Sequence, residues 1–165
     1  MIRERSGSVL SEWCLAGNAM SDISVHHVGF VVQSISDSID DFLGSLGVQW
    51  DGQIFHDPLQ GVRVTFLRSH GAHPRETAFE LVEPVGASSP VFTFSKRGGG
   101  LHHVCYEVPC LDDQLSVSQN AGCLLVKPPQ PAIAFGGRRI GWVMTKNRLL
   151  VEYLERIHDP DSTGS

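Results

Sequence analysis

Two histidines and two glutamates occupy matching places in two similar stretches of the chain. His27 and His103 each follow another histidine at the start of an apolar segment, and Glu80 and Glu152 each interrupt a later one. A carboxylate in an apolar strand is costly unless it is paired or bound to a metal. Two carboxylates balance the charge of a divalent cation, and two neutral imidazoles complete a set of four ligands while positions for water or substrate stay open. The pattern predicts a metal site.

Each of these residues alone has a simpler interpretation, because a strand histidine is usually a hydrogen-bonded structural residue and a strand glutamate usually faces water. Their recurrence at equivalent positions favours the metal. Side chains of a strand alternate between its two faces, so His27 lies on the opposite face from Val28, and His103 on the opposite face from Val104. We therefore expect the valines in the core and the histidines together on the other face.

The elements that position these residues form an internal repeat, which fixes the architecture before any role is assigned. Each copy begins with a histidine-bearing strand rich in β-branched and aromatic residues. A segment of helical spacing that ends at glycine follows, and the last strand carries the glutamate. Each copy is therefore a βαβββ unit. The expected strands are 26–32, 48–56, 61–67 and 77–82 in the first copy and 101–108, 123–127, 139–144 and 149–154 in the second, with helices from Ile35 to Gly47 and from Leu111 to Gly122.

The repeat also divides the chain into parts. A segment rich in Gly, Ser and Pro joins the two copies and contains a short apolar stretch that favours one helical turn. Both ends of the chain are polar and unpatterned, and we expect Met20 to be the functional start. We expect one domain over residues 23–157, made of module one at 23–85, a connector at 86–100 and module two at 101–157, with a flexible tail at 1–22 and a second tail at 158–165.

Composition excludes several classes of function. The chain has 165 residues, 41% of them hydrophobic, which suffices for the core of one domain. Its net charge of −5 and its scattered Lys and Arg argue against binding nucleic acid, which needs a concentrated basic face. No apolar run is long enough to span a bilayer, and Glu12 interrupts what would be the apolar segment of a signal peptide. The four cysteines form no CxxC pair, so we expect a reduced, cytoplasmic protein without nucleic-acid or membrane partners.

The doubled pattern resembles the vicinal oxygen chelate superfamily, which contains glyoxalases, bleomycin resistance proteins and dioxygenases. The resemblance covers about residues 23–157, and within the superfamily it is greatest to the methylmalonyl-CoA epimerases. The motifs that carry it are His-His-Val-Gly at 26–29, Gln-Gly-Val at 60–62, Glu-Leu-Val-Glu-Pro at 80–84, Gly-Leu-His-His-Val at 100–104 and Leu-Val-Glu at 150–152.

The resemblance implies an α+β fold in which two βαβββ modules form a curved mixed-sheet cup around a metal site. Carried over position by position, His27, Glu80, His103 and Glu152 are the ligands of one divalent metal ion, which is Co, Mn, Ni, Zn, Mg or Fe. The implied activity is that of an epimerase or isomerase, because a metal-chelated carbonyl makes its neighbouring carbon more acidic. Glu80 or Glu152 would then carry the proton. Related proteins are often dimers, so we expect a homodimer.

The substrate depends on two further features of the sequence. Val64 stands where some epimerases carry a glutamate proposed as catalytic base, and a valine cannot move a proton. The acid and base therefore stay unassigned beyond the two glutamates of the ligand set. A small-molecule substrate that is an acyl-CoA or another carbonyl acid would need cationic contacts, for which we expect Arg63, Arg138 and Arg139 near the mouth of the cup.

Two other classes of function, a different metalloenzyme and a metal-free binding protein, share the same fold. A glyoxalase-like lyase, a ring-cleaving dioxygenase or another metalloenzyme of a biosynthetic pathway would keep the metal site and change the reaction. The common ligand set of such dioxygenases is two histidines and one glutamate, so Glu80 as a fourth ligand argues against them. A metal-free protein that sequesters a drug between its modules generally lacks a complete ligand set. The four retained residues therefore argue against sequestration as well.

Overall fold

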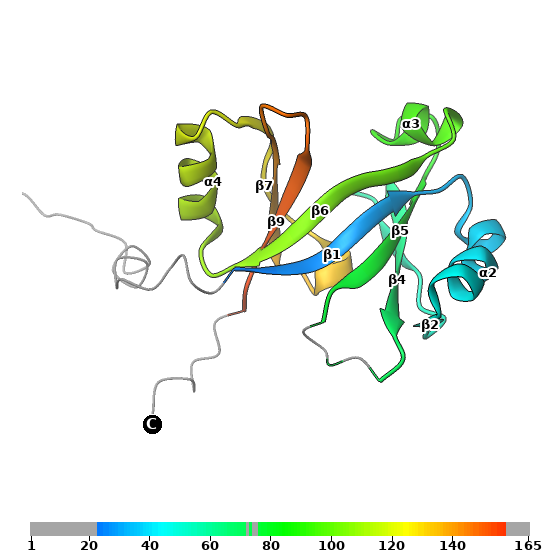
Figure 1. Ribbon diagram of the computed structural model, residues 1–165. Helices are drawn as coiled ribbons and strands as arrows, with labels where there is room; N and C mark the ends of the chain where they lie inside the picture. Colours follow the sequence, from blue (N-terminus) through cyan, green and yellow to red (C-terminus); the bar gives the residue numbers. More distant parts are fainter. Residues whose placement is uncertain (1–22, 72, 74–75, 158–165) are drawn as a thin grey trace, which may run out of the picture.

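The computed structural model describes residues 23–71, 73 and 76–157, so the expectations for 1–22, including a start at Met20, and for 158–165 lie outside the described residues. Figure 1 shows the arrangement of the elements. Within the described residues, no helix combines the length and the apolar character needed to cross a membrane. The elements are β1 (Ser24–Val31), α2 (Ile35–Leu46), β2 (Val48–Trp50), β3 (Phe55–Asp57), β4 (Val62–Ser69), β5 (Ala78–Pro84), α3 (Phe92–Lys96), β6 (Gly100–Val108), α4 (Leu111–Asn120), β7 (Leu124–Pro131), a 3-10 turn η1 (Ile133–Phe135), β8 (Arg139–Met144) and β9 (Leu150–Glu155).

The strands form one mixed sheet whose two halves have equivalent arrangements of strands. The strand order is β2-β4-β5-β1-β6-β9-β8-β7, and β3 pairs with β4. In each half the first strand runs parallel to the last, as β1 does to β5 and β6 to β9. The halves join where β1 and β6 pair antiparallel at the centre of the sheet (Figure 1). This confirms the expected α+β class with an open, curved mixed sheet.

The internal repeat extends to the register of the strands. In the first half, Gly29 of β1 lies opposite Glu80 of β5. In the second half, Cys105 of β6 lies opposite Glu152 of β9. Each of these opposed residues stands two positions after the histidine of its strand, and residues two apart share a face. Each half therefore presents one histidine and one glutamate on the same face of the sheet.

The helices follow the local signals of the sequence closely. The side chain of Ser34 accepts a hydrogen bond from the backbone N–H of Asp37 and caps the start of α2. Gly47 ends that helix with a φ of 63°, a left-handed conformation that a residue without Cβ adopts easily. In the connector, α3 supplies the expected helical turn.

The segment from 48 to 56 differs from expectation, because it forms two short strands, β2 and β3, that both pair with β4. A turn separates them. Gly52 has a φ of 82°, and the side chain of Asp51 accepts a hydrogen bond from the backbone N–H of Gln53. Such an Asx-type turn breaks an extended strand in two.

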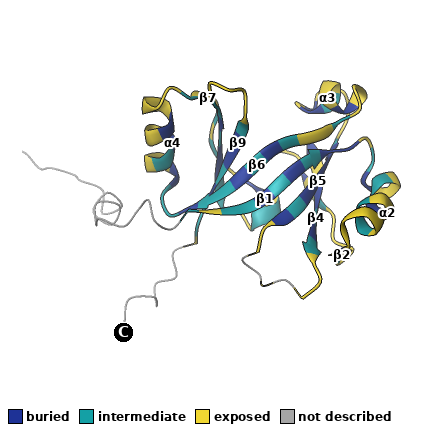
Figure 2. Ribbon diagram, in the orientation of Figure 1, coloured by how far each residue is buried: buried dark blue, intermediate teal, exposed yellow. Residues whose placement is uncertain are grey.

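Apolar side chains are buried on both faces of the sheet. On the helix side, Ile35 and Ile39 of α2 pack on Leu67 and Leu81 of the sheet. On the opposite side, which the histidines share, Val31 packs with Val62 and other valines. Figure 2 shows that the exposed residues of α2 and α4 lie on their outer faces, away from the sheet. Helix α2 therefore packs on the face of the sheet opposite the histidines.

Candidate metal centre and pocket

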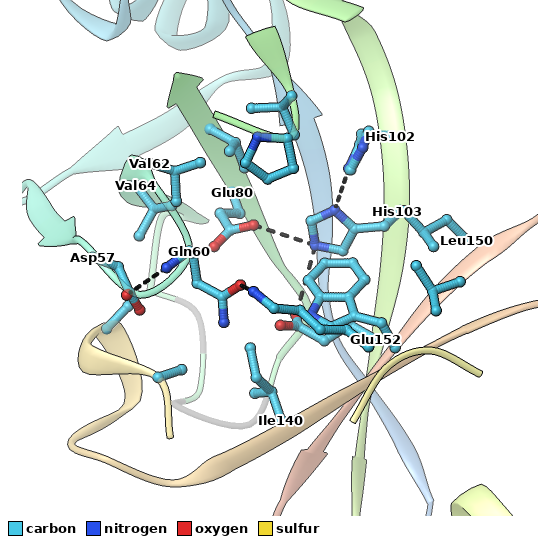
Figure 3. Close-up of a pocket in the computed structure, with 18 of the residues that line it drawn as sticks. Asp57, Gln60, Val62, Val64, Glu80, His102, His103, Ile140, Leu150 and Glu152 are labelled. Atoms are coloured by element: carbon cyan, nitrogen blue, oxygen red, sulfur yellow. Dashed lines mark hydrogen bonds and ion pairs between the residues drawn. The ribbon is translucent and has the colours of Figure 1, made fainter. Parts of the chain in front are cut away.

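Four buried side chains from the four central strands meet at one point. The Nε2 atoms of His27 and His103 lie 3.1 Å apart. Oε2 of Glu80 lies 3.4 Å from Nε2 of His27 and 3.3 Å from Nε2 of His103. Oε2 of Glu152 lies 3.1 Å and 3.7 Å from the same two nitrogens. Figure 3 shows Glu80, His103 and Glu152 converging at the pocket.

The chemistry of this donor set fits a divalent cation. Nitrogen and oxygen ligands bind such ions at about 2.0–2.2 Å, so two ligands of one ion lie roughly 3.0–3.6 Å apart. The separations above that involve a histidine nitrogen fall close to that range. The ligand atoms of His27, Glu80 and His103 all lie within 4.8 Å of one another, and Glu152 contacts the two histidines. Among the described residues, moreover, no hydrogen-bond donor is aligned with the buried Oε2 atom of Glu152. An unsatisfied buried carboxylate oxygen is costly, and a cation would satisfy it.

The electrostatics of the cluster also favour bound positive charge. Burial alone would raise the pKa of Glu80, but the adjacent His27 and His103 bring it well below its usual value. Burial alone would lower the pKa of His27, but the carboxylate of Glu80 is the largest of the influences that raise it well above its usual value. These shifts favour the ionised form of Glu80 and the protonated form of His27. A cation bound between them would take the place of that proton.

A second histidine stands behind each histidine of the cluster. Nδ1 of His26 lies 2.9 Å from Nδ1 of His27, and Nδ1 of His102 lies 3.1 Å from Nδ1 of His103. Burial is the main cause that lowers the pKa of His26 and of His102 to about 4, so both are neutral near pH 7. A neutral imidazole can accept the Nδ1–H of its neighbour. Such a contact fixes the ring and leaves Nε2 free to bind a metal.

The two halves of the cluster differ at one pair of equivalent positions. A Cβ atom placed on Gly29 would lie 2.0 Å from Cε1 of His103, so only glycine leaves room for that ring. Cys105 occupies the equivalent position beside His27 and is fully buried. Burial raises the pKa of its thiol well above the usual value, so Cys105 stays protonated there.

The cluster lies at the wall of a cavity of about 530 Å³ that is lined mainly by apolar side chains. The ring of Trp142 contacts His103 edge-on at 4.8 Å between centroids. The ring of Phe135 stacks on His27 at 5.7 Å. A cavity of this size and character suits a small organic ligand, or one end of a larger ligand, beside the polar cluster.

Comparison with known proteins gives the family. The sequence profile of the Glyoxalase/Bleomycin resistance protein/Dioxygenase superfamily matches residues 26–142. The chain belongs to this superfamily.

Relatives within the superfamily include several epimerases. The chain is 28% identical over 137 residues to the ethylmalonyl-CoA/methylmalonyl-CoA epimerase of Cereibacter sphaeroides, which covers 81% of this chain and 97% of that protein. It is 32% identical over 134 residues to the uncharacterized protein YqjC of Bacillus subtilis, covering 78% of this chain and 89% of YqjC. Its fold is similar to that of methylmalonyl-CoA epimerase from Mycobacterium tuberculosis, with a TM-score of 0.68, 24% identity, and coverage of 81% of this chain and 88% of that one. Within the superfamily, the chain is most like the methylmalonyl-CoA epimerases.

Two of the three arginines expected at the mouth of the cup, Arg63 and Arg139, occupy equivalent positions in the two modules. Arg63 lies opposite Glu83 in the β4–β5 pair and forms an ion pair with it. Glu83 also accepts the backbone N–H of Ile35, at 2.8 Å, at the start of α2. Arg139 binds Glu155 at 2.7 Å, and Glu155 accepts the first N–H of α4. In each module, the arginine therefore supports a glutamate that caps the helix.

The third arginine is engaged elsewhere. Arg138 pairs with Glu107 and donates to the backbone oxygen of Glu155 at 2.7 Å. None of the three arginines lies among the residues that line the cavity. The structure thus brings together the four residues expected to bind a metal, and it places the three arginines expected to bind substrate away from the cavity.

The cavity contains polar residues that sequence reasoning did not select. Asp57, Gln60 and Lys127 line it together with Glu80 and Glu152. The signal for Lys127 was present, because it ends the apolar run Leu-Leu-Val at 124–126 just as the two glutamates interrupt theirs. Val64 also lines the cavity and is buried, so no proton-transferring group stands at that position.

Proposed function

We propose that this protein is a metal-dependent epimerase or isomerase of the methylmalonyl-CoA epimerase type. It would move a proton at the carbon next to the carbonyl of an acyl thioester. The observation that carries the proposal is the buried set of two imidazoles and two carboxylates at the wall of an apolar cavity. His27, Glu80, His103 and Glu152 would hold one divalent ion, which is Co, Mn, Ni, Zn, Mg or Fe.

When bound, a divalent ion supplies Lewis acidity that stabilises the negative charge of an enolate oxygen. The residues of the chain supply the remaining requirements. Trp142, Phe135 and the valines of the cavity exclude water, which strengthens electrostatic interactions at the reacting centre. Glu80 and Glu152 are the carboxylates of the four-residue cluster, both line the cavity, and they are the groups we assign to proton transfer.

Epimerisation needs one group to remove a proton and another to return it on the opposite face of the carbon. Glu80 stands on β5 and Glu152 on β9, on opposite sides of the central β1–β6 pair. A substrate bound over that pair would therefore have one carboxylate on each side. This placement supports a two-base reaction even though Val64 offers no base.

The relatives named as epimerases of ethylmalonyl-CoA or methylmalonyl-CoA support the choice of an acyl thioester as substrate. The volume of the cavity suits the acyl end, and the CoA moiety would then lie outside it. We further propose that the enzyme acts in the cytoplasm as a homodimer, without nucleic-acid or membrane partners.

Two measurements test the metal and the reaction separately. Elemental analysis of purified protein should find about one metal ion per chain, and His103→Ala should abolish it, whereas the exposed control His56→Ala should not. Metal content unchanged in His103→Ala would refute the site. In heavy water, NMR should show deuterium entering the α-carbon of methylmalonyl-CoA. Absence of exchange with metal bound would exclude this substrate and shift weight to a lyase reaction.

A further inference from the structure

A second polar cluster lines the cavity that contains the candidate metal centre. Nζ of Lys127 donates a hydrogen bond to Oε1 of Gln60 at 2.8 Å and lies 3.5 Å from the backbone oxygen of Leu59. The two side chains come from different modules, Lys127 from β7 and Gln60 from the turn before β4. In Figure 3, Gln60 lies between Asp57 and the cavity, across from His103.

A strand irregularity brings Lys127 into the cavity. Leu125 pairs with Val143, but the next pair is Lys127 with Trp142, so Val126 is an extra residue in β7. Residues directly opposite each other in an antiparallel pair share a face, and Trp142 lines the cavity. Without the bulge, Val126 would oppose Trp142. Bulges next to functional sites commonly redirect one side chain in this way.

Gln60 is held in place by Asp57. One carboxylate oxygen of Asp57 accepts the backbone N–H groups of Leu59 and Gln60, at 3.0 and 3.1 Å. The other accepts the backbone N–H of Ile133 from the second module, at 3.0 Å. The turn that carries Gln60 is therefore attached to both modules, and the carboxylate that attaches it is occupied by backbone donors.

The cluster has hydrogen-bond donors to spare. The ammonium group of Lys127 fixes the orientation of the Gln60 amide, because only its oxygen can accept from a lysine. Nε2 of Gln60 is consequently turned away, and within the described part of the chain this buried atom has no partner. No carboxylate of the described residues forms an ion pair with Lys127 either, although Asp57 interacts with it at longer range. In the described ranges, the buried amide nitrogen of Gln60 thus lacks an acceptor, and the ammonium group of Lys127 contacts only neutral oxygens.

We propose that Lys127 and Gln60 form a subsite for an acidic oxygen of the substrate, such as a carboxylate, at the part of the molecule that the metal does not chelate. The substrate would be a carbonyl compound with an apolar middle and a second, anionic group. A carboxylate has two oxygens and can accept from the ammonium and the amide together. The inference rests on the proposed function only for the chelated end of the substrate.

Calorimetric titration with carboxylic acids tests the subsite without any turnover. The full-length chain is loaded with Mn²⁺ and titrated with monocarboxylates of three to six carbons and with the dicarboxylates of equal length, malonate to adipate. For at least one length, the dicarboxylate should bind about tenfold tighter or more, as expected for a charge-assisted hydrogen bond in a partly buried site. Lys127→Met should remove this gain and leave the monocarboxylate affinity unchanged.

Matched variants separate the subsite from general effects of charge. Lys146→Met removes an exposed lysine outside the cavity and should preserve the gain. Gln60→Leu removes the unpartnered amide donor, should reduce the gain, and serves if Lys127→Met fails to fold. Equal gains in the wild type and in Lys127→Met or Gln60→Leu would overturn the subsite. Loss of Mn²⁺ binding itself would instead refute the proposed metal centre, so the two failures are distinguishable.

Discussion

Replacement of Gly29 by alanine should strongly weaken metal binding, although every proposed ligand residue remains in the sequence. The new Cβ atom would lie 2.0 Å from Cε1, 2.4 Å from Nδ1 and 2.6 Å from Nε2 of His103. Carbon atoms in favourable contact are about 3.5–4.0 Å apart, so the ring must move by roughly 1.5 Å. Metal–ligand distances tolerate only about 0.2 Å, and His103 would therefore be lost as a ligand.

The magnitude follows from the number of ligands affected. Loss of an outer-shell partner costs about 10- to 100-fold in metal affinity, and removal of a ligand costs more. We therefore expect Gly29→Ala to weaken metal binding by at least about 100-fold, or about 2.7 kcal/mol. Calorimetric titration of the metal-free protein measures this directly, and circular dichroism shows whether the variant remains folded.

Gly44→Ala is the matched control, because no atom lies within 4 Å of a Cβ placed on Gly44. Gly44 lies inside α2, where alanine is favoured over glycine by about 0.5–1 kcal/mol. This variant should be slightly more stable and should bind metal like the wild type. If a folded Gly29→Ala protein binds metal within twofold of the wild type, His103 is not a ligand and the reasoning fails.

Two further predictions concern the residues behind the site. His102→Ala should weaken metal binding by about 10- to 100-fold in calorimetric titration, because the ring of His103 loses the neighbour that fixes it; unchanged affinity would show that the His102 contact is incidental. Arg63→Met should lower the free energy of unfolding by about 0.5–1 kcal/mol in urea titration, a modest value because 44% of the Arg63 side chain is exposed. Metal affinity should not change in Arg63→Met, and a large loss of ligand binding at full stability would restore its role as a substrate contact.

Local patterns and the repeat were enough to predict most of the fold. Strand alternation placed His27 and His103 on one face, and the glycine at 47 correctly ended α2. The equivalence of the two modules converted four weak signals into one expectation, because two histidines and two glutamates recur at matching positions. The ligand set stays a prediction, and direct measurement of bound metal tests it.

The remaining features depend on pairings that alternation alone does not reveal. Arg63 and Arg139 were expected as substrate contacts. Arg63 instead lies opposite Glu83 in its strand pair, and Arg139 forms an ion pair with Glu155. Lys127 lies opposite Trp142 and lines the cavity because of a single extra residue in β7, which shifts the register of the strand pair. The amide of Gln60 could not be anticipated either, since its position depends on Asp57 contacting the second module.

The central β1–β6 pair has a consequence for the lifetime of the protein. Each module contributes one imidazole and one carboxylate, so neither holds a complete set of ligands by itself. An ion bound between them would stabilise only the folded arrangement in which both modules are joined, by about 2.7 kcal/mol when free metal is 100 times the dissociation constant. Metal scarcity would then act twice, by emptying the site and by exposing the chain to unfolding and proteolysis.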